Sequence, residues 1–176
     1  MIRLGPLRSH DRERVAEVLV STTAFSSDEV DVALELFDEC HPERSEGSAR
    51  ALPSGDYELV GAFDANDHLM GYACFGPTPA TDGTYDLYWL AVDPASQGQG
   101  VGRTLLRHVE SSLAKRRARL LVVETSSRVD YAQTRTFYAR SGYAEVARVR
   151  DFYATADDRI ILTARITTRE GGVATQ

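Results

Sequence analysis

Cysteine is scarce in this sequence, and long apolar runs are missing from it. The two cysteines, Cys40 and Cys74, lack the spacing of metal ligands. The first four residues are too polar for a secretory signal, and no apolar run has the length that a membrane crossing needs. These absences predict a reduced, cytoplasmic protein that binds no metal and no membrane, with both thiols serving as packing groups.

Positive charge is also in deficit, because 20 lysines and arginines stand against 26 acidic residues, for a net charge of -6. This balance argues against nucleic-acid binding through the overall field and favours cationic partners such as amines. The 176 residues show no internal repeat and no second regime of composition. We therefore predict one mixed α/β domain with a sizeable core.

Residues 89–106 hold the most informative pattern of the chain. An aromatic, apolar run stops at Asp93-Pro94, a glycine-rich loop follows, and a helical pattern begins at once. A helix N-terminus offers free N–H donors and a partial positive charge. Backbone donors can also approach a ligand closely at three alternating glycines, Gly98, Gly100 and Gly102. The stretch therefore predicts a pyrophosphate site.

Three phosphate-binding patterns can be compared with this loop. The dinucleotide pattern G-x-G-x-x-G fails because Arg103 stands at its last position. The triphosphate pattern G-x-x-x-x-G-K-[ST] fails at Gln97, in place of glycine, and at Arg103, in place of lysine. The pattern [QR]-x-x-G-x-[GA] fits without exception from Gln97 to Gly102. That loop resembles the acyl-CoA pyrophosphate loop of the GNAT acetyltransferase superfamily; a glycine-rich turn without a ligand is the alternative.

A second motif agrees with the first. Residues 136–143, Thr-Phe-Tyr-Ala-Arg-Ser-Gly-Tyr, are similar to a GNAT helix whose tyrosine, here Tyr138, lies near the thioester sulfur and can protonate the departing thiolate. The alternative is a core aromatic beside Phe137. The sequence departs from the family at Tyr131, where an asparagine often contacts the cofactor, and at Thr134, where alanine is frequent. The Tyr131 ring is a candidate for packing on the adenine or the pantetheine arm.

The resemblance covers about residues 1–166 and implies an α/β, single-domain GNAT-like fold, with a mixed central sheet of about six or seven strands and about four flanking helices. Domain limits are predicted as an acetyltransferase domain at 1–168, with an exposed polar loop at 41–56 inside it, and a flexible tail at 169–176. The loop is either a surface excursion or a lid over the substrate site. Strands are expected near 2–7, 57–63, 69–75, 85–92, 120–123, 143–149 and 159–166. Helices are expected after Ser9, from the capping box Ser26–Glu29 to about 40, over 101–117, and over 131–141.

The chemistry implied by the resemblance is acetyl transfer from acetyl-CoA to a primary amine by direct attack, without an acyl-enzyme. One backbone N–H of the central strand would face the thioester carbonyl. Cofactor contacts are expected at Leu90, Ala91, Val92, Gln97, Gly98, Gln99, Gly100, Val101, Gly102, Arg103 and Thr104. Glu124, at the end of the strand predicted to be buried on both faces, is the first candidate for the base that deprotonates the amine, and Asp86 is the second. The alternative for each is an acidic residue that has no catalytic part.

Aromatic and acidic residues suggest an acceptor pocket with cation–π contacts and carboxylate pairing. Its candidates are Asp86, Tyr88, Trp89, Tyr131, Asp151 and Tyr153, with Arg128 and Phe152 nearby; ordinary core packing is the alternative. The acceptor is expected to be a small-molecule amine or a peptide or protein amine, with no nucleic acid as partner and a homodimer as one candidate assembly. The competing function is a non-catalytic acyl-CoA-binding or regulatory module.

Overall fold

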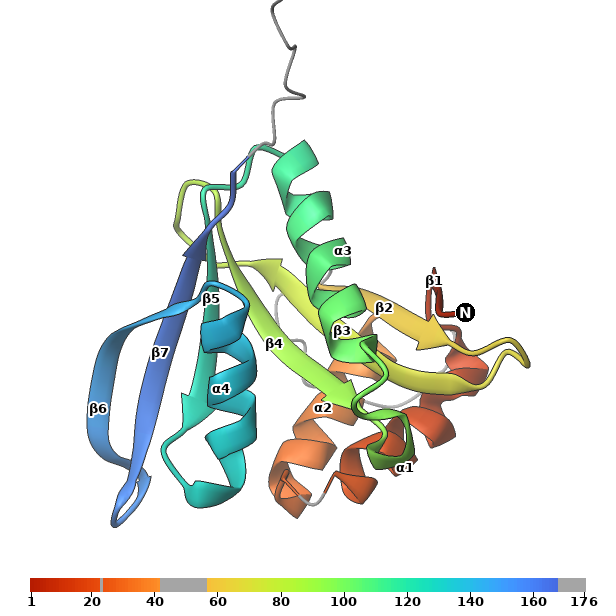
Figure 1. Cartoon of the computed structure of the whole chain (residues 1–176), viewed down its shortest axis with the longest axis horizontal. Coiled ribbons are helices and arrows are strands. Elements are labelled where there is room, and N and C mark those ends of the chain that lie inside the picture. The colour runs from red at the N-terminus through yellow and green to blue at the C-terminus, as the bar shows by residue number, and fades with distance from the viewer. Residues whose placement is uncertain (23, 42–56, 168–176) are drawn as a thin grey trace, which may run out of the picture.

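The computed structural model describes residues 1–22, 24–41 and 57–167. Their strands form a seven-stranded sheet with the order β1-β2-β3-β4-β5-β7-β6 (Figure 1). Neighbouring strands pair in antiparallel fashion except β4 and β5, which are parallel. The strands are β1 Arg3–Gly5, β2 Glu58–Phe63, β3 Leu69–Pro77, β4 Thr84–Val92, β5 Leu120–Ser126, β6 Ala144–Ala154 and β7 Asp157–Arg165. This mixed sheet confirms the predicted fold class.

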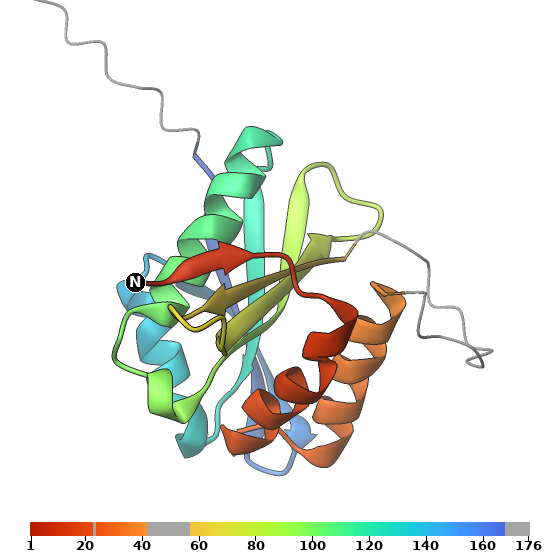
Figure 2. The same cartoon turned by 90° about the vertical axis from the view of Figure 1, so that its right-hand side faces the viewer.

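Four α-helices cover the two faces of the sheet. They are α1 Arg12–Ser21, α2 Ser27–Glu39, α3 Val101–Lys115 and α4 Ala132–Arg140. Figure 2 shows α1 and α2 on the opposite side of the sheet from α3 and α4. None of the helices in the described ranges is long and apolar enough to cross a membrane.

Local sequence explains where these helices begin and end. Ser26 and Glu29 form the expected capping box at the start of α2, since each side chain accepts a hydrogen bond from the other residue's backbone N–H. Gly142 follows α4 with a φ of 92°, a left-handed conformation that favours glycine. Ser9 does not cap α1 as expected. It lies in a preceding 3-10 turn, and Asp11 takes the N-cap position.

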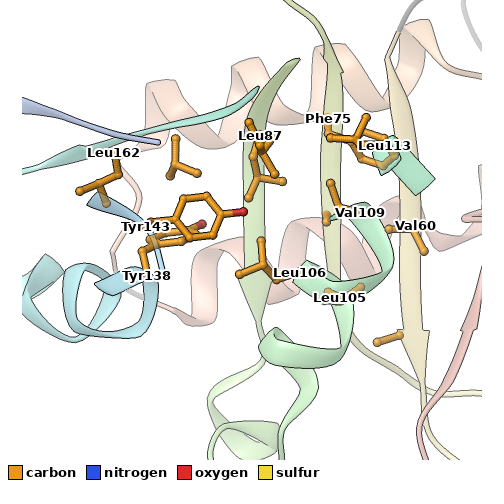
Figure 3. Packing of buried hydrophobic residues seen from close by; sticks show 14 of the residues in the cluster. Val60, Phe75, Leu87, Leu105, Leu106, Val109, Leu113, Tyr138, Tyr143 and Leu162 are labelled. Carbon is orange, nitrogen blue, oxygen red and sulfur yellow. The ribbon is translucent and has the colours of Figure 1, made fainter. Parts of the chain in front are cut away.

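Two apolar clusters hold the layers together. One lies between the sheet and α3, where the helix buries five apolar side chains at helical spacing, Val101, Leu105, Leu106, Val109 and Leu113. Tyr138 and Tyr143 extend this cluster toward α4 (Figure 3). The other cluster lies under α1 and α2 and includes Phe37 and Tyr72. Both faces of the central strands are thereby covered.

Some boundaries differ from the prediction. β5 continues beyond Val123 to Ser126, and of its first four residues only Leu121 and Val123 are fully buried. β6 reaches Ala154, and every residue in it is exposed because it forms the edge of the sheet. The predicted loop 41–56 lies outside the described residues except for His41. The two ring nitrogens of His41 lie within hydrogen-bond distance of the carbonyls of Phe37 and Leu7. The predicted limit at 168 and the tail 169–176 also lie outside the described residues.

Candidate active site

The two central strands separate halfway along their length. β4 and β5 pair from Thr84↔Leu120 to Leu87↔Val123, and their pairing ends there. At the same point β4 has an extra residue relative to β3, since Cys74 pairs with Trp89 while Phe75 pairs with Leu87. Such a β-bulge bends a strand and interrupts its pairing. The two strands diverge beyond it (Figure 1), and two cavities lie around the opening.

The first cavity, which we name the donor cavity, has a volume of about 770 Å³. β4, the glycine loop, the start of α3 and α4 contribute to its wall. Most of the predicted cofactor contacts line it: Leu90, Ala91, Val92, Gln97, Gly98, Gly100, Val101, Gly102 and Arg103. Gln99 and Thr104 do not line it; their side chains donate hydrogen bonds to the carbonyls of Ala95 and Gly100.

The glycine loop has the geometry of a backbone anion site. Gly98 and Gly100 have φ values of 76° and 83°, which favour glycine, and a Cβ on either would meet no atom within 4 Å. A side chain there would therefore extend into open space beside the donor cavity. Gly102 differs, since a Cβ on it would lie 3.6 Å from Phe137 and Val92. Because Gly100 is also the N-cap of α3, the free N–H groups of the first turn lie beside the same space.

An ion pair fixes the entry to this loop. Asp93, directly after β4, accepts a hydrogen bond from the N–H of Ala95 at 2.9 Å and pairs with Arg14 of α1. Arg14 also donates to the carbonyl of Leu69 in β3. Burial opposes ionisation of Asp93, but the bonds from Ala95 and Arg14 outweigh it and hold the pKa of that carboxyl below its usual value. The loop is thus anchored to α1 and to β3.

Tyr138 lines the donor cavity from α4 and is 4% exposed. Its ring packs edge-on against Phe137 and Tyr143. The Tyr143 hydroxyl donates to Glu110, whereas the Tyr138 hydroxyl has no hydrogen-bond partner in the described part of the chain. Burial raises the pKa of Tyr138, so the phenol keeps its proton at neutral pH. It can therefore act as a hydrogen-bond and proton donor toward the cavity.

The second cavity, which we name the acceptor cavity, has a volume of about 820 Å³ and lies next to the first. Seven residues line both cavities: Phe25, Leu87, Tyr88, Trp89, Glu124, Thr125 and Tyr131. Its carboxylates, Asp28, Glu29, Asp86, Glu124 and Asp157, outnumber its arginines, Arg128 and Arg159. Aromatic rings and an excess of negative charge surround the space, which is an environment suited to an ammonium group.

Most of the predicted acceptor residues meet in this cavity, namely Asp86, Tyr88, Trp89, Tyr131 and Tyr153. The Tyr131 hydroxyl donates to the carbonyl of Ala24 at 2.7 Å, which fixes the ring between the two cavities. Asp151 is not among the lining residues of either cavity. It is exposed, has a φ of 51°, and accepts a hydrogen bond from the N–H of Ala156 within the β6–β7 hairpin.

Glu124 lines both cavities, but it is not at the end of its strand. It stands two residues before the end of β5 and forms an ion pair with Arg159 of β7. Three further residues, Thr125, Asp157 and Arg159, line the acceptor cavity and were not predicted from the sequence. Glu124 and Arg159 are 35 residues apart, so only the pairing of β5 with β7 brings them together. Burial raises the pKa of both cysteine thiols, and neither cysteine lines the donor cavity or the acceptor cavity.

Comparison with known proteins gives the same family as the two motifs. Residues 56–145 match the family model described as "Acetyltransferase (GNAT) domain". The chain is 36% identical over 87 residues to the [ribosomal protein bS18]-alanine N-acetyltransferase of Escherichia coli K12, which is 49% of this chain and 57% of that enzyme. The match thus spans little more than half of that enzyme. An N-alpha-acetyltransferase RimI from Mycobacterium tuberculosis is 30% identical over 155 residues, or 86% of this chain and 84% of that one.

A solved structure extends the likeness to the whole fold. A GNAT-family protein from Desulfovibrio desulfuricans superposes with a TM-score of 0.84 at 40% identity, covering 95% of this chain and all of the other. The family match, the mycobacterial relative and this superposition agree with one another. The chain belongs to the GNAT acetyltransferase family, which confirms the family predicted from the loop and the helix and supports acetyl-CoA as the donor.

Proposed function

We propose that this protein transfers the acetyl group of acetyl-CoA to a primary amine, which attacks the thioester directly. The observation that supports this reaction best is the contact between the two cavities. One cavity is bordered by the glycine loop and the start of α3, and the other by carboxylates and aromatic rings. Because the two cavities share lining residues, a thioester in one and an amine in the other would lie side by side. The amine could then attack the thioester directly, without a covalent enzyme intermediate.

In this proposal the backbone of the glycine loop and the first turn of α3 bind the pyrophosphate, and Leu90 to Val92 bind the pantetheine arm. Tyr138 protonates the departing thiolate. Glu124 takes a proton from the ammonium, directly or through a water, before the amine attacks. Arg159 forms an ion pair with the Glu124 carboxylate and holds it in place. Asp86, which accepts a hydrogen bond from Thr78, is the second candidate for the base.

The acceptor is proposed to be an amine on a body that aromatic rings can hold, either a small molecule or the end of a peptide or protein. The names of the relatives favour the peptide arm, since the Escherichia coli enzyme is named for an alanine of ribosomal protein bS18. The excess of carboxylates in the acceptor cavity favours a cationic acceptor in either case. A cytoplasmic location and a homodimer are retained as predictions.

A panel of amines tests this proposal. The purified protein is mixed with acetyl-CoA and with a polyamine, an amino acid, an aminoglycoside, a lysine peptide or a peptide with an N-terminal alanine, and thiol release is followed. Turnover that depends on one of these amines supports the enzyme. Tight CoA binding by calorimetry without turnover on any of them would instead support the alternative, a non-catalytic acyl-CoA-binding module.

A further inference from the structure

The Thr125 hydroxyl of the candidate site is a buried polar group without a hydrogen-bond partner in the described part of the chain. In the described part of the chain, four buried side-chain polar atoms lack a hydrogen bond: Glu39 Oε2, Tyr72 OH, Thr125 Oγ1 and Arg159 Nε. Thr125 and Arg159 line the acceptor cavity, and Thr125 lines the donor cavity as well. The Arg159 guanidinium still reaches Glu124 through another nitrogen. Thr125 is 5% exposed, and its only side-chain polar atom is the unpaired one.

A buried hydroxyl without a partner costs stability, and most such groups in proteins are paired. An apolar residue of the same shape, such as valine, would avoid that cost at position 125. The unpaired hydroxyl of Thr125 is explained if a bound ligand supplies its hydrogen-bond partner. The two cavities that meet at Thr125 make this explanation specific, because both ligands of the proposed reaction would lie next to it.

The strand places Thr125 on the donor side of the opening. Alternate residues of a strand share one face, so Leu121, Val123 and Thr125 point the same way. Leu121 and Val123 belong to the apolar cluster that contains Tyr138. Thr125 lies just beyond Val123, where the pairing with β4 has ended. It therefore stands on the wall opposite residues 90–92 of β4, which also line the donor cavity.

We propose that the Thr125 hydroxyl donates a hydrogen bond to the carbonyl oxygen of the acetyl group during attack, and that it is a catalytic residue. This inference rests on the proposed function. The amine nitrogen forms a bond to the thioester carbon, and the carbonyl electron pair moves onto the oxygen. Thr125 stabilises that negative charge from the β5 wall, opposite the backbone of β4, and gives up no proton. The carbonyl then re-forms as the C–S bond breaks, and the thiolate takes its proton from Tyr138. The nitrogen, still positively charged after the attack, gives its second proton through water to the Tyr138 phenolate, so the amide is neutral and Tyr138 is protonated again.

Two substitutions and one control separate this role from a structural one. Thr125→Val keeps the shape and removes the hydroxyl, whereas Thr125→Ser keeps the hydroxyl and removes a methyl group. Tyr72→Phe is the matched control, because it removes another unpaired buried hydroxyl, from the cluster under α1 and α2, and Tyr72 lines neither cavity. Each variant is measured for thermal unfolding, for CoA binding by calorimetry, and for kcat and KM with the best amine of the panel.

The expected pattern has opposite signs for stability and activity. Thr125→Val should unfold at an unchanged or higher temperature, bind CoA as the wild type does, and lose about 10- to 10³-fold in kcat. Thr125→Ser should keep kcat within about threefold, since its hydroxyl can still donate. Tyr72→Phe should keep kcat and unfold at an unchanged or higher temperature.

Three results would overturn the inference. If the wild type is active and Thr125→Val has the same kcat, the hydroxyl is only an unpaired core group. A loss of CoA affinity as large as the loss of kcat/KM means that Thr125 contacts the pantetheine arm and not the acetyl oxygen. A wild type that acetylates no amine of the panel refutes the proposed function and, with it, the role assigned to Thr125.

Discussion

Removal of the Tyr138 hydroxyl should separate catalysis from folding. In Tyr138→Phe the ring still fills its place between Phe137 and Tyr143, and no hydrogen bond to the described chain is lost. The unfolding free energy should therefore change little. Without its proton donor the departing thiolate must be protonated by water, and we expect kcat to fall about 10- to 10⁴-fold, the range for loss of an acid–base group.

The raised pKa of Tyr138 sharpens the same test. Because burial keeps the phenol protonated, the wild type should not lose its proton donor as pH rises from neutral to mildly alkaline values. The assay follows thiol release at saturating acetyl-CoA and amine across this range. The ratio of wild-type to Tyr138→Phe kcat should stay constant until the folded protein itself fails.

Tyr143→Phe provides the control. Tyr143 is equally buried and belongs to the same cluster, but its hydroxyl donates to Glu110 at 2.9 Å and it lines neither cavity. Loss of that bond to a charged group should cost about 1–3 kcal/mol of unfolding free energy and leave kcat nearly unchanged. If Tyr138→Phe turns over as fast as the wild type, Tyr138 is a core aromatic and the proton comes from elsewhere.

Three further outcomes are expected. Gly100→Val places a β-branched side chain at a φ of 83° beside the donor cavity, so CoA affinity measured by calorimetry should fall at least about tenfold; unchanged affinity contradicts the loop assignment. Glu124→Gln should lower kcat/KM most at low pH, where the amine is protonated, and keep CoA binding; a uniform loss at every pH assigns Glu124 to holding substrate or strand instead. Burial raises the pKa of Tyr72, Tyr138 and Tyr143, so stability is complete below the unfolded pKa near ~10 and falls above it by about 1.4 kcal/mol per pH unit for each tyrosine. The unfolding free energy, measured in urea at several alkaline pH values, should fall less steeply with pH in Tyr72→Phe than in the wild type. An equal dependence on pH in the two proteins refutes this account.

The local backbone geometry expected from the sequence is found in the glycine loop and at the end of α4. A loop that binds with its backbone needs glycine at positions with positive φ, and Gly98 and Gly100 have such values. The helix before Gly142 likewise fixes the place of Tyr138, because the helix and its end are both encoded within residues 132–142. Neither inference required knowledge of how distant strands pair.

The acceptor side depends on pairing between distant strands, and there the prediction was less complete. Arg159 and Asp157 reach the cavity only through the register of β5 with β7, in which Glu124 stands opposite Ile161. Glu124 was wrongly predicted to stand at the end of its strand. The apolar run stops at Val123, but β5 continues to Ser126. Asp151 was predicted as an acceptor residue together with Tyr153. It lies in an irregular stretch of β6, where its carboxylate accepts a hydrogen bond from Ala156, and it does not line the cavity.

The bulge in β4 is the feature on which both cavities depend. In a regular strand, neighbouring side chains point to opposite faces, so Tyr88 and Trp89 would not be expected to border the same spaces. With an extra residue at this point, both of them line both cavities. The bulge coincides with the end of the β4–β5 pairing, so the backbone of β4 beyond Leu87 is no longer paired with β5, although it still pairs with β3. The acyl group and the amine are proposed to meet at this opening. No glycine or proline stands between Tyr85 and Val92 to indicate the bulge. Local sequence patterns therefore predict the glycine loop and Tyr138, but not the opening between β4 and β5.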